Sequence, residues 1–240
     1  MITKILALPL LQALTTLTIA GGLSIAIADE PNSKSTSQPQ SPPPKPADSD
    51  AELAEGWPGG TKPGAIEVKR YPAYRGAVAT AKDIPLKSAA DNILFFSLFN
   101  HISRNEIAMT APVVNTYSPS MIETPDAKGE MTMEFVYRTP RIGQTGKGTG
   151  AVQVVDHPAA VYVCLGVQGG LSDKQLTEGI QKLKAWLADH KEEWVQDGSP
   201  RRLGYHGPMT PVAQRLWEVQ LPIKPAPKAK AKGVAPATDG

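Results

Sequence analysis

The feature that most constrains the fold of this chain is an internal repeat. The segment "VKRYPA" at residues 68–73 returns as "VVDHPA" at residues 154–159, and "MTAP" at 109–112 returns as "MTP" at 209–211. Two echoes in the same order, separated by 86 and 100 residues, indicate a duplicated structural unit rather than a chance match. The core of the protein is therefore expected to consist of two similar halves.

Each half shows the same order of expected elements: a strand interrupted by proline, a helix and two further strands. In the first half these are residues 65–81, 89–103, 106–117 and 130–139. In the second half they are residues 151–167, 173–190, 200–210 and 215–223. Alternation of apolar and polar residues marks the strands, and Ser88 and Ser172 open the helices as capping residues. The fold class is predicted to be α+β: duplicated βαββ units that form a distorted, barrel-like antiparallel or mixed sheet with two helices.

The chain divides into four expected parts. Residues 1–28 carry one charge, Lys4, and end in Ala26-Ile27-Ala28, which is typical of a secretory signal cleaved after Ala28. The protein is therefore expected to be secreted or periplasmic. The alternative is an uncleaved membrane tether, because the uncharged run is long enough to span a bilayer.

Low-complexity segments flank the expected domain at residues 61–222. Residues 29–60 are rich in Pro, Ser and acidic residues, and residues 223–240 are rich in Lys, Ala and Pro, so both are expected to be flexible. The domain itself is nearly balanced in charge, with 18 basic and 16 acidic residues, which argues against nucleic acid as a partner. The single cysteine, Cys164, lies in an apolar run and is expected to be a buried, unreactive side chain.

The expected first helix is apolar on two sides. One side, expected to face the core, carries Leu94, Phe95, Leu98, Phe99 and Ile102. Ala89, Ile93 and Phe96 project from the other side at 100° per residue. Two explanations remain open. A loop or the linker covers the second side, or the second side lines a cleft for a ligand.

Five segments, "RYPAYRGAV", "LFNHISRNEIAMTAPVV", "MTMEFVYRTP", "LKAWLADH" and "GYHGPMTPVAQRLWEVQLPI", together resemble the SOUL/heme-binding protein family. The resemblance covers nearly all of residues 65–222, and "IAMTAPV" is its most specific part. It implies a distorted barrel of two βαββ halves. It also implies non-covalent binding of heme or a related planar, hydrophobic tetrapyrrole, as carrier or buffer, in an apolar cleft beside the first helix.

Carried over by position, the resemblance implies that seven residues line this cleft: Ile93, Phe95, Phe96, Phe99, Met109, Tyr205 and Met209. His101, between the two apolar sides of the helix, is the best candidate for an iron ligand, since neutral imidazole is a usual axial ligand of heme. Basic side chains that vertebrate members keep on this helix are missing here between Lys87 and Arg104. Pro112 and Pro211 are expected to interrupt strand pairing, either to open the cleft or only to shape the sheet.

Two other functions remain open. An enzyme on the same scaffold, such as a small-molecule hydrolase, would need an acidic pair, for which Glu106 and Glu134 are candidates. An envelope protein whose cleft is filled by its own side chains would bind nothing. No motif for nucleophilic hydrolysis is found in the sequence, so the chain is not expected to be an enzyme.

Overall fold

A computed structural model describes residues 50–88, 90–124 and 126–227. The expected signal sequence at residues 1–28, residues 29–49 of the expected linker and residues 228–240 of the expected tail lie outside this range. Within the described range, no helix combines the length and the apolar character that crossing a membrane requires.

The secondary structure repeats as the sequence predicts. The first half contains β1 (Ile66–Tyr71), β2 (Tyr74–Pro85), α1 (Ala90–Arg104), β3 (Val113–Tyr117), α2 (Pro119–Glu123) and β4 (Lys128–Val136). The second half contains β6 (Gln153–His157), β7 (Ala160–Gln168), α3 (Asp173–Asp189), β8 (Trp194–Gln196), β9 (Arg201–Gly204) and β10 (Leu216–Pro225). β5 (Gly146–Lys147) lies between the halves, and a short 3-10 turn (Val212–Gln214) precedes β10. Pro72 and Pro158 each separate two strands, because proline has no N–H to donate to a ladder.

Helix α3 begins with the predicted capping box. The Ser172 side chain accepts a hydrogen bond from the backbone N–H of Gln175, and the Gln175 side chain accepts one from the backbone N–H of Ser172. The short elements α2, β5 and β8 were not predicted. Each has five residues or fewer, which is too short to show an apolar period.

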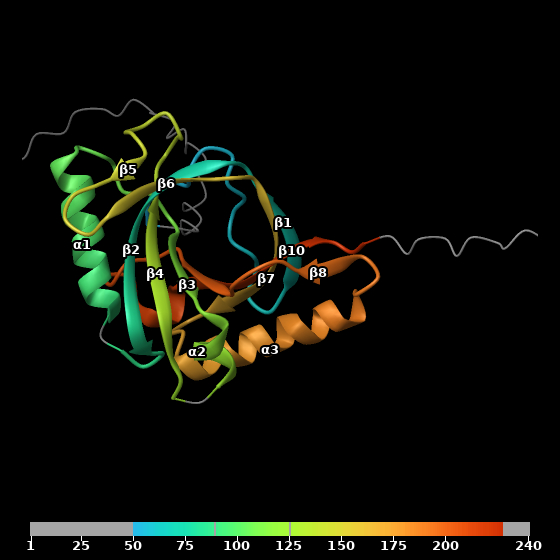
Figure 1. The fold of residues 1–240 in the computed structure, drawn as a ribbon. Helices are drawn as coiled ribbons and strands as arrows, with labels where there is room; N and C mark the ends of the chain where they lie inside the picture. The colour runs from blue at the N-terminus through green and yellow to red at the C-terminus, as the bar shows by residue number, and fades with distance from the viewer. Residues whose placement is uncertain (1–49, 89, 125, 228–240) are drawn as a thin grey trace, which may run out of the picture. The chain divides into compact units, whose positions relative to one another are not determined.

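The strands form one antiparallel sheet in the order β1-β7-β10-β9-β3-β4-β2-β6-β5, with β8 paired to β10. The two halves exchange strands: β1 of the first half pairs with β7 of the second, and β6 of the second half pairs with β2 of the first (Figure 1). β9 and β3 join the halves directly at the centre of the order. The predicted fold class is confirmed: the structure is a mixed α+β fold with a large antiparallel sheet that does not close into a barrel.

The two faces of the sheet are covered differently. On one, which we call the helix face, α1 packs on β2 and β4, and α3 packs on β7 and β10 (Figure 1). Period-two alternation separates the faces: on β4, Met131, Met133 and Phe135 join the core beneath the helices, whereas Val136 joins a second core on the opposite face.

That opposite face is covered by residues 50–60, which we call the strap, and is named the strap face. Ala54 and Trp57 are 5% and 6% exposed, and Leu53 forms a parallel bridge with Ala111. The backbone N–H of Glu55 donates to the carbonyl of Arg138 at 2.8 Å. These residues were expected to belong to a flexible linker, but the structure packs them into the domain, because a buried tryptophan and backbone hydrogen bonds hold them in place.

Strand β3 begins directly after Pro112, so the expected interruption of pairing occurs there. The interruption does not open a cleft, since Pro112 is buried and the strap pairs with its neighbour Ala111. Pro211 is exposed and lies just before the 3-10 turn, outside any strand. The strap therefore covers the sheet at Pro112, and no cleft is found there.

Candidate functional site: the exposed side of the first helix

Helix α1 is apolar on both sides, and the described part of the chain covers only one of them. Leu94, Leu98 and Ile102 are buried in the core beneath the helices. On the other side, Ile93 and Phe96 are each 68% exposed. Phe99 was expected on the core side but is 48% exposed, so it belongs with Ile93 and Phe96. We call these three residues the α1 apolar face. Adjacent, solvent-exposed, large apolar side chains are typical of a surface that binds a ligand, a protein or a membrane.

Aromatic contacts connect the α1 apolar face to the core. The Phe95 ring stacks on Phe99 at a centroid distance of 6.2 Å and meets Phe96 edge-on at 6.1 Å. On its other side it meets buried Phe135 of β4 at 5.1 Å. Met109 is partly buried against the same core. Phe95 therefore supports the face from behind, while Ile93, Phe96 and Phe99 are its accessible part.

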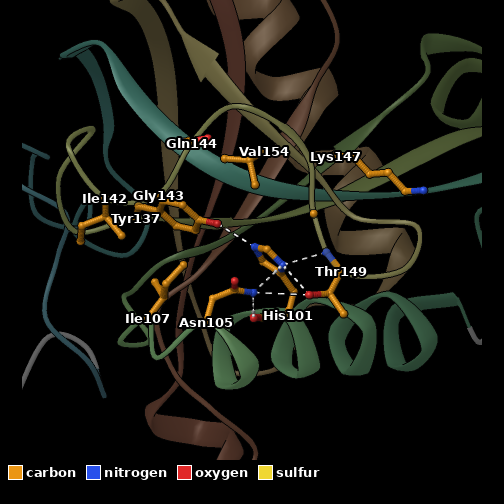
Figure 2. A pocket seen from close by; sticks show the side chains of 11 residues that line it. His101, Asn105, Ile107, Tyr137, Ile142, Gly143, Gln144, Lys147, Thr149 and Val154 are labelled. Carbon is orange, nitrogen blue, oxygen red and sulfur yellow. Dashed lines mark hydrogen bonds between the residues drawn. The ribbon is translucent and has the colours of Figure 1, made fainter.

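A cavity of about 460 Å³ lies at the C-terminal end of α1 (Figure 2). It is lined by His101, Asn105, Ile107, Tyr137, Ile142, Gly143, Gln144, Lys147, Gly148, Thr149 and Val154. Six of these residues come from the loop 139–152 between β4 and β6, which the sequence marks only as a connection between the halves. The volume is within the usual range for small-molecule sites.

His101 ties this loop to α1. Its Nδ1 accepts a hydrogen bond from the backbone N–H of Thr149 at 3.1 Å, and its Nε2 lies 2.8 Å from the Tyr137 hydroxyl (Figure 2). A backbone N–H can only donate, so the proton of the neutral ring is on Nε2, which donates to Tyr137. Both ring nitrogens are therefore occupied, and a metal ion at either one would have to displace a protein partner.

Burial lowers the pKa of His101 below its ordinary value of 6.5. Because the unfolded chain then binds more protons than the folded one, the stability that neutral His101 contributes is complete above about pH 6.5 and is lost as the pH falls below it. We expect a pH titration followed by NMR to give a midpoint below 6.5 for this ring. A His101→Gln variant, which does not titrate at this position, should lose less stability than the wild type between pH 7 and pH 5. A midpoint at or above 6.5 would contradict this assignment.

Two cations lie near the C-terminal end of α1. Lys147 of β5 lines the cavity and is exposed. Arg104, in the last turn, is also exposed, and its Nε donates to the Asn100 side chain at 3.1 Å. Sequence reasoning considered only the helix and missed Lys147, because β5 is brought to α1 by the tertiary fold.

Tyr205 and Met209 do not join the α1 apolar face. Tyr205 is 2% exposed and belongs to the core on the strap face with Trp57 and Leu203. Met209 is 93% exposed and borders a separate hollow of about 900 Å³ that Asp50 also lines. The sheet separates Tyr205 from α1, which the linear order of the motifs does not reveal.

The two candidate acidic residues are also apart. Glu106 is exposed in the turn after α1, with a φ of 54°. Glu134 is 6% exposed on the strap face, where it lies 2.8 Å from His157 Nε2 and accepts a hydrogen bond from the Tyr74 hydroxyl at 3.2 Å. Neither residue lines the cavity beside α1. Nor do three or more metal-binding side chains gather at any point in the described part of the chain.

The family model described as "SOUL heme-binding protein" matches residues 59–222, which is more than half of the chain and includes α1, the residues that line the cavity and the sheet up to the middle of β10. The chain belongs to the SOUL heme-binding protein family. Among curated proteins, no match is found for the chain. The sequence resemblance to this family is thus confirmed.

Solved structures share the fold of this SOUL domain at low sequence identity. The C-terminal domain of EcmrR aligns with a TM-score of 0.54 and 17% identity, over 69% of this chain and 98% of that one. An uncharacterized conserved protein from Listeria innocua aligns with a TM-score of 0.51 and 11% identity, over 68% and 93% of the two chains. Identities this low show the fold alone.

The SOUL domain fits one part of a heme better than the other. The α1 apolar face suits the flat hydrocarbon surface of a porphyrin, and Lys147 and Arg104 suit its carboxylates. The iron finds no equally good partner, because both nitrogens of His101 are hydrogen-bonded within the protein. Iron coordination by His101 stays a prediction from the sequence, and the observed bonds do not favour it.

Proposed function

We propose that this SOUL domain binds heme or a related tetrapyrrole without a covalent bond, against the α1 apolar face, as a carrier or buffer that performs no reaction. The observation that carries the proposal is the exposure of Ile93 and Phe96, which are each 68% exposed on a helix that packs its other side into the core. Among the residues that the structure describes, neither the strap nor a loop covers them.

The expected driving force is burial of apolar surface. Fully burying a large apolar side chain contributes about 1.5–3 kcal/mol, so covering the exposed two-thirds of Ile93 and Phe96 contributes on the order of 1–2 kcal/mol each. The ring stack of Phe95 on Phe99 holds the face in one arrangement, which lowers the entropy cost of binding. When bound, heme would supply the planar apolar surface, and Lys147 and Arg104 would meet its carboxylates.

The experiment is a titration of a chain that comprises residues 50–227 with hemin, followed by the Soret band and by quenching of tryptophan fluorescence. We expect saturable binding in the micromolar range or tighter, and at least about tenfold weaker binding for Phe96→Ser, since about 1.4 kcal/mol is a factor of ten. Met209→Ser and Val212→Ser are matched controls, because both residues are exposed and apolar but are not on α1. Equal affinity in all variants, or no spectral change in the wild type, would refute the proposal.

The hydrolase alternative gains no support from this site. The lining of the cavity contains no carboxylate, serine or cysteine, and its histidine, His101, already accepts from the backbone N–H of Thr149 and contacts the Tyr137 hydroxyl. Glu134, the buried candidate, lies on the opposite face of the sheet.

We further propose that binding occurs outside the cytoplasm, because residues 1–28 have the pattern of a secretory signal.

A further inference from the structure

The exposed side of α1 differs from that of α3, the equivalent helix of the second half. Both helices cover the helix face of the sheet, α1 on β2 and β4 and α3 on β7 and β10. The residues that α3 exposes include four charged side chains, Lys174, Glu178, Lys182 and Asp189. Besides the α1 apolar face, α1 exposes Asn92, Asn100, Ser103 and Arg104. A surface helix normally carries charged residues on its solvent side, as α3 does, so the nearly uncharged exposed side of α1 calls for a reason.

The exposed side of α1 carries no carboxylate. Asp91, the only acidic residue of the helix, is directed to the sheet, where it accepts hydrogen bonds from Asn115 of β3 at 3.2 Å and from Arg202 of β9 at 3.0 Å. Neutral side chains lose less free energy than ions when they leave water. This side of α1 can therefore enter an apolar medium without removing water from a negative charge.

Three exposed basic residues lie at the two ends of the α1 apolar face. Lys87 precedes α1, Arg104 is in its last turn, and Lys147 of β5 lines the cavity at its C-terminal end. None of the three forms an ion pair with a residue that the structure describes. Figure 2 shows the ammonium group of Lys147 pointing away from the His101 ring. Glu106, in the turn after α1, is exposed too, so the ends of the face together carry a net positive charge.

We propose that the α1 apolar face also docks the protein onto the surface of a lipid bilayer that contains anionic phospholipids. Its three side chains enter the boundary between head groups and acyl chains, as the apolar side of an interfacial helix does. Lys87, Arg104 and Lys147 stay at the level of the head groups, where their charges are attracted to the lipid phosphates. This partner is additional to the ligand of the proposed function, and the face meets it when no tetrapyrrole covers it.

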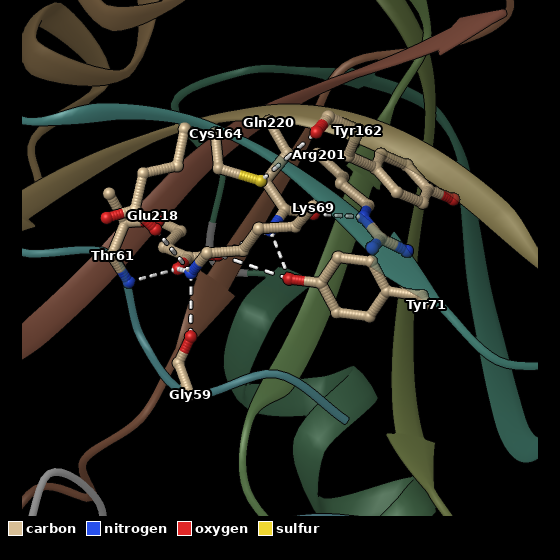
Figure 3. A network of polar contacts seen from close by, with 10 residues as sticks. Gly59, Thr61, Lys69, Tyr71, Tyr162, Cys164, Arg201, Glu218 and Gln220 are labelled. Carbon is tan, nitrogen blue, oxygen red and sulfur yellow. Dashed lines mark hydrogen bonds and ion pairs between the residues drawn. The ribbon is translucent and has the colours of Figure 1, made fainter. Parts of the chain in front are cut away.

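A bilayer suits this surface better than a protein partner does. The face offers three large side chains, whereas a stable protein interface commonly takes about 20–30 residues from each side. A bilayer needs only a few inserted apolar side chains when cations add electrostatic attraction. The strap face offers no comparable surface, because the strap covers it and the charges beneath, Lys69 and Glu218, are buried and paired with each other (Figure 3).

The test is sedimentation of a chain that comprises residues 50–227 with lipid vesicles, in the absence of hemin. This chain contains both cores and every strand, and it leaves out the lysines of residues 228–240, which would attract anionic lipid by themselves. We expect it to bind vesicles of equimolar phosphatidylcholine and phosphatidylglycerol, and to bind phosphatidylcholine alone at least about tenfold more weakly, since each cation near an anionic surface contributes about fivefold.

Two pairs of variants separate the apolar and the charged contributions. Phe96→Ser should weaken binding at least about tenfold, whereas Met209→Ser, which replaces a residue that is exposed and apolar but not on α1, should bind as the wild type does. Lys147→Gln should weaken binding to the anionic vesicles about fivefold. Lys191→Gln is its matched control, because Lys191 is exposed but follows α3, at the end of the domain away from α1 (Figure 1).

A fluorescence probe on α1 locates the contact directly. We expect lipids with brominated acyl chains to quench Phe96→Trp strongly and the wild type little, because none of the four native tryptophans is on α1. Absence of binding to the anionic vesicles, or equal binding by Phe96→Ser, would overturn the proposal. A dimer in solution that Phe96→Ser abolishes would assign the face to a second copy and would also overturn it. Since no hemin is present, failure here would leave the proposed function standing, and failure of hemin to bind would leave this result standing.

Discussion

Replacing Trp57 with alanine is expected to destabilise the domain by about 3–5 kcal/mol, the usual cost of removing a buried large aromatic side chain. Trp57 is 6% exposed and meets Tyr71 and Tyr74 edge-on at centroid distances of 4.9 and 5.0 Å. Its loss would leave a cavity between strands β1 and β2 and the strap. Urea unfolding followed by far-UV circular dichroism measures the change without depending on tryptophan fluorescence.

A variant of the strap that spares its buried residues is the control. Glu55→Ala removes an ion pair with Arg141 in which both side chains are more than half exposed, and such pairs contribute about 0–1 kcal/mol. A chain that begins at residue 61, where composition alone places the start of the domain, should be at least as unstable as Trp57→Ala. The strap would not be part of the fold if Trp57→Ala unfolded within 1 kcal/mol of the wild type.

The second large effect is expected at the buried ion pair of the strap face. Lys69→Met should cost about 3–5 kcal/mol, because it leaves the Glu218 carboxylate, which is 0% exposed, without its counter-charge. The substitution also removes the hydrogen bond from Lys69 Nζ to the carbonyl of Gly59 at 2.6 Å, which links β1 to the strap. The free energy of unfolding in urea is again the measurement.

The double variant Lys69→Met/Glu218→Gln separates the charge from the packing. Glutamine carries no charge and keeps an oxygen that can accept from the backbone N–H of Thr61, which donates to Glu218 Oε1 at 2.5 Å, but its amide nitrogen replaces the oxygen that accepts from Gln220, so this one hydrogen bond is lost. The double variant should therefore be more stable than Lys69→Met alone. If it were less stable, the unpaired charge would not be the cause of the loss.

Much of the fold could be predicted because short sequence patterns mark where its strands and helices begin and end. The repeated prolines, Pro72 and Pro158, mark the same break in both halves, and the capping box at Ser172 fixes the start of α3. The strap escaped prediction for the opposite reason. Its acidic, proline- and glycine-containing sequence resembles a linker, and only Trp57 with Leu53 and Ala54 signals burial. That burial depends on partners more than ten residues away in sequence, which no local pattern reveals.

The sequence was sufficient to predict the part of the candidate site that lies on helix α1, but not the residues that contact α1 from other elements. The positions of Ile93 and Phe96 on a helical wheel were enough to predict a second apolar side, and the structure leaves that side exposed. The partners of His101 could not be predicted, because Tyr137 and Thr149 reach it through the tertiary path of the loop 139–152. Tyr205 was placed with α1 by motif order, but strand alternation directs it to the other face.

The most direct test of the central claim, that the exposed side of α1 is the binding surface, is hydrogen exchange of the protein with and without hemin. The account predicts slower exchange in residues 90–104 and in the loop 139–152, and unchanged exchange in the strap. Protection confined to the strap, or hemin binding that leaves α1 unprotected, would contradict it.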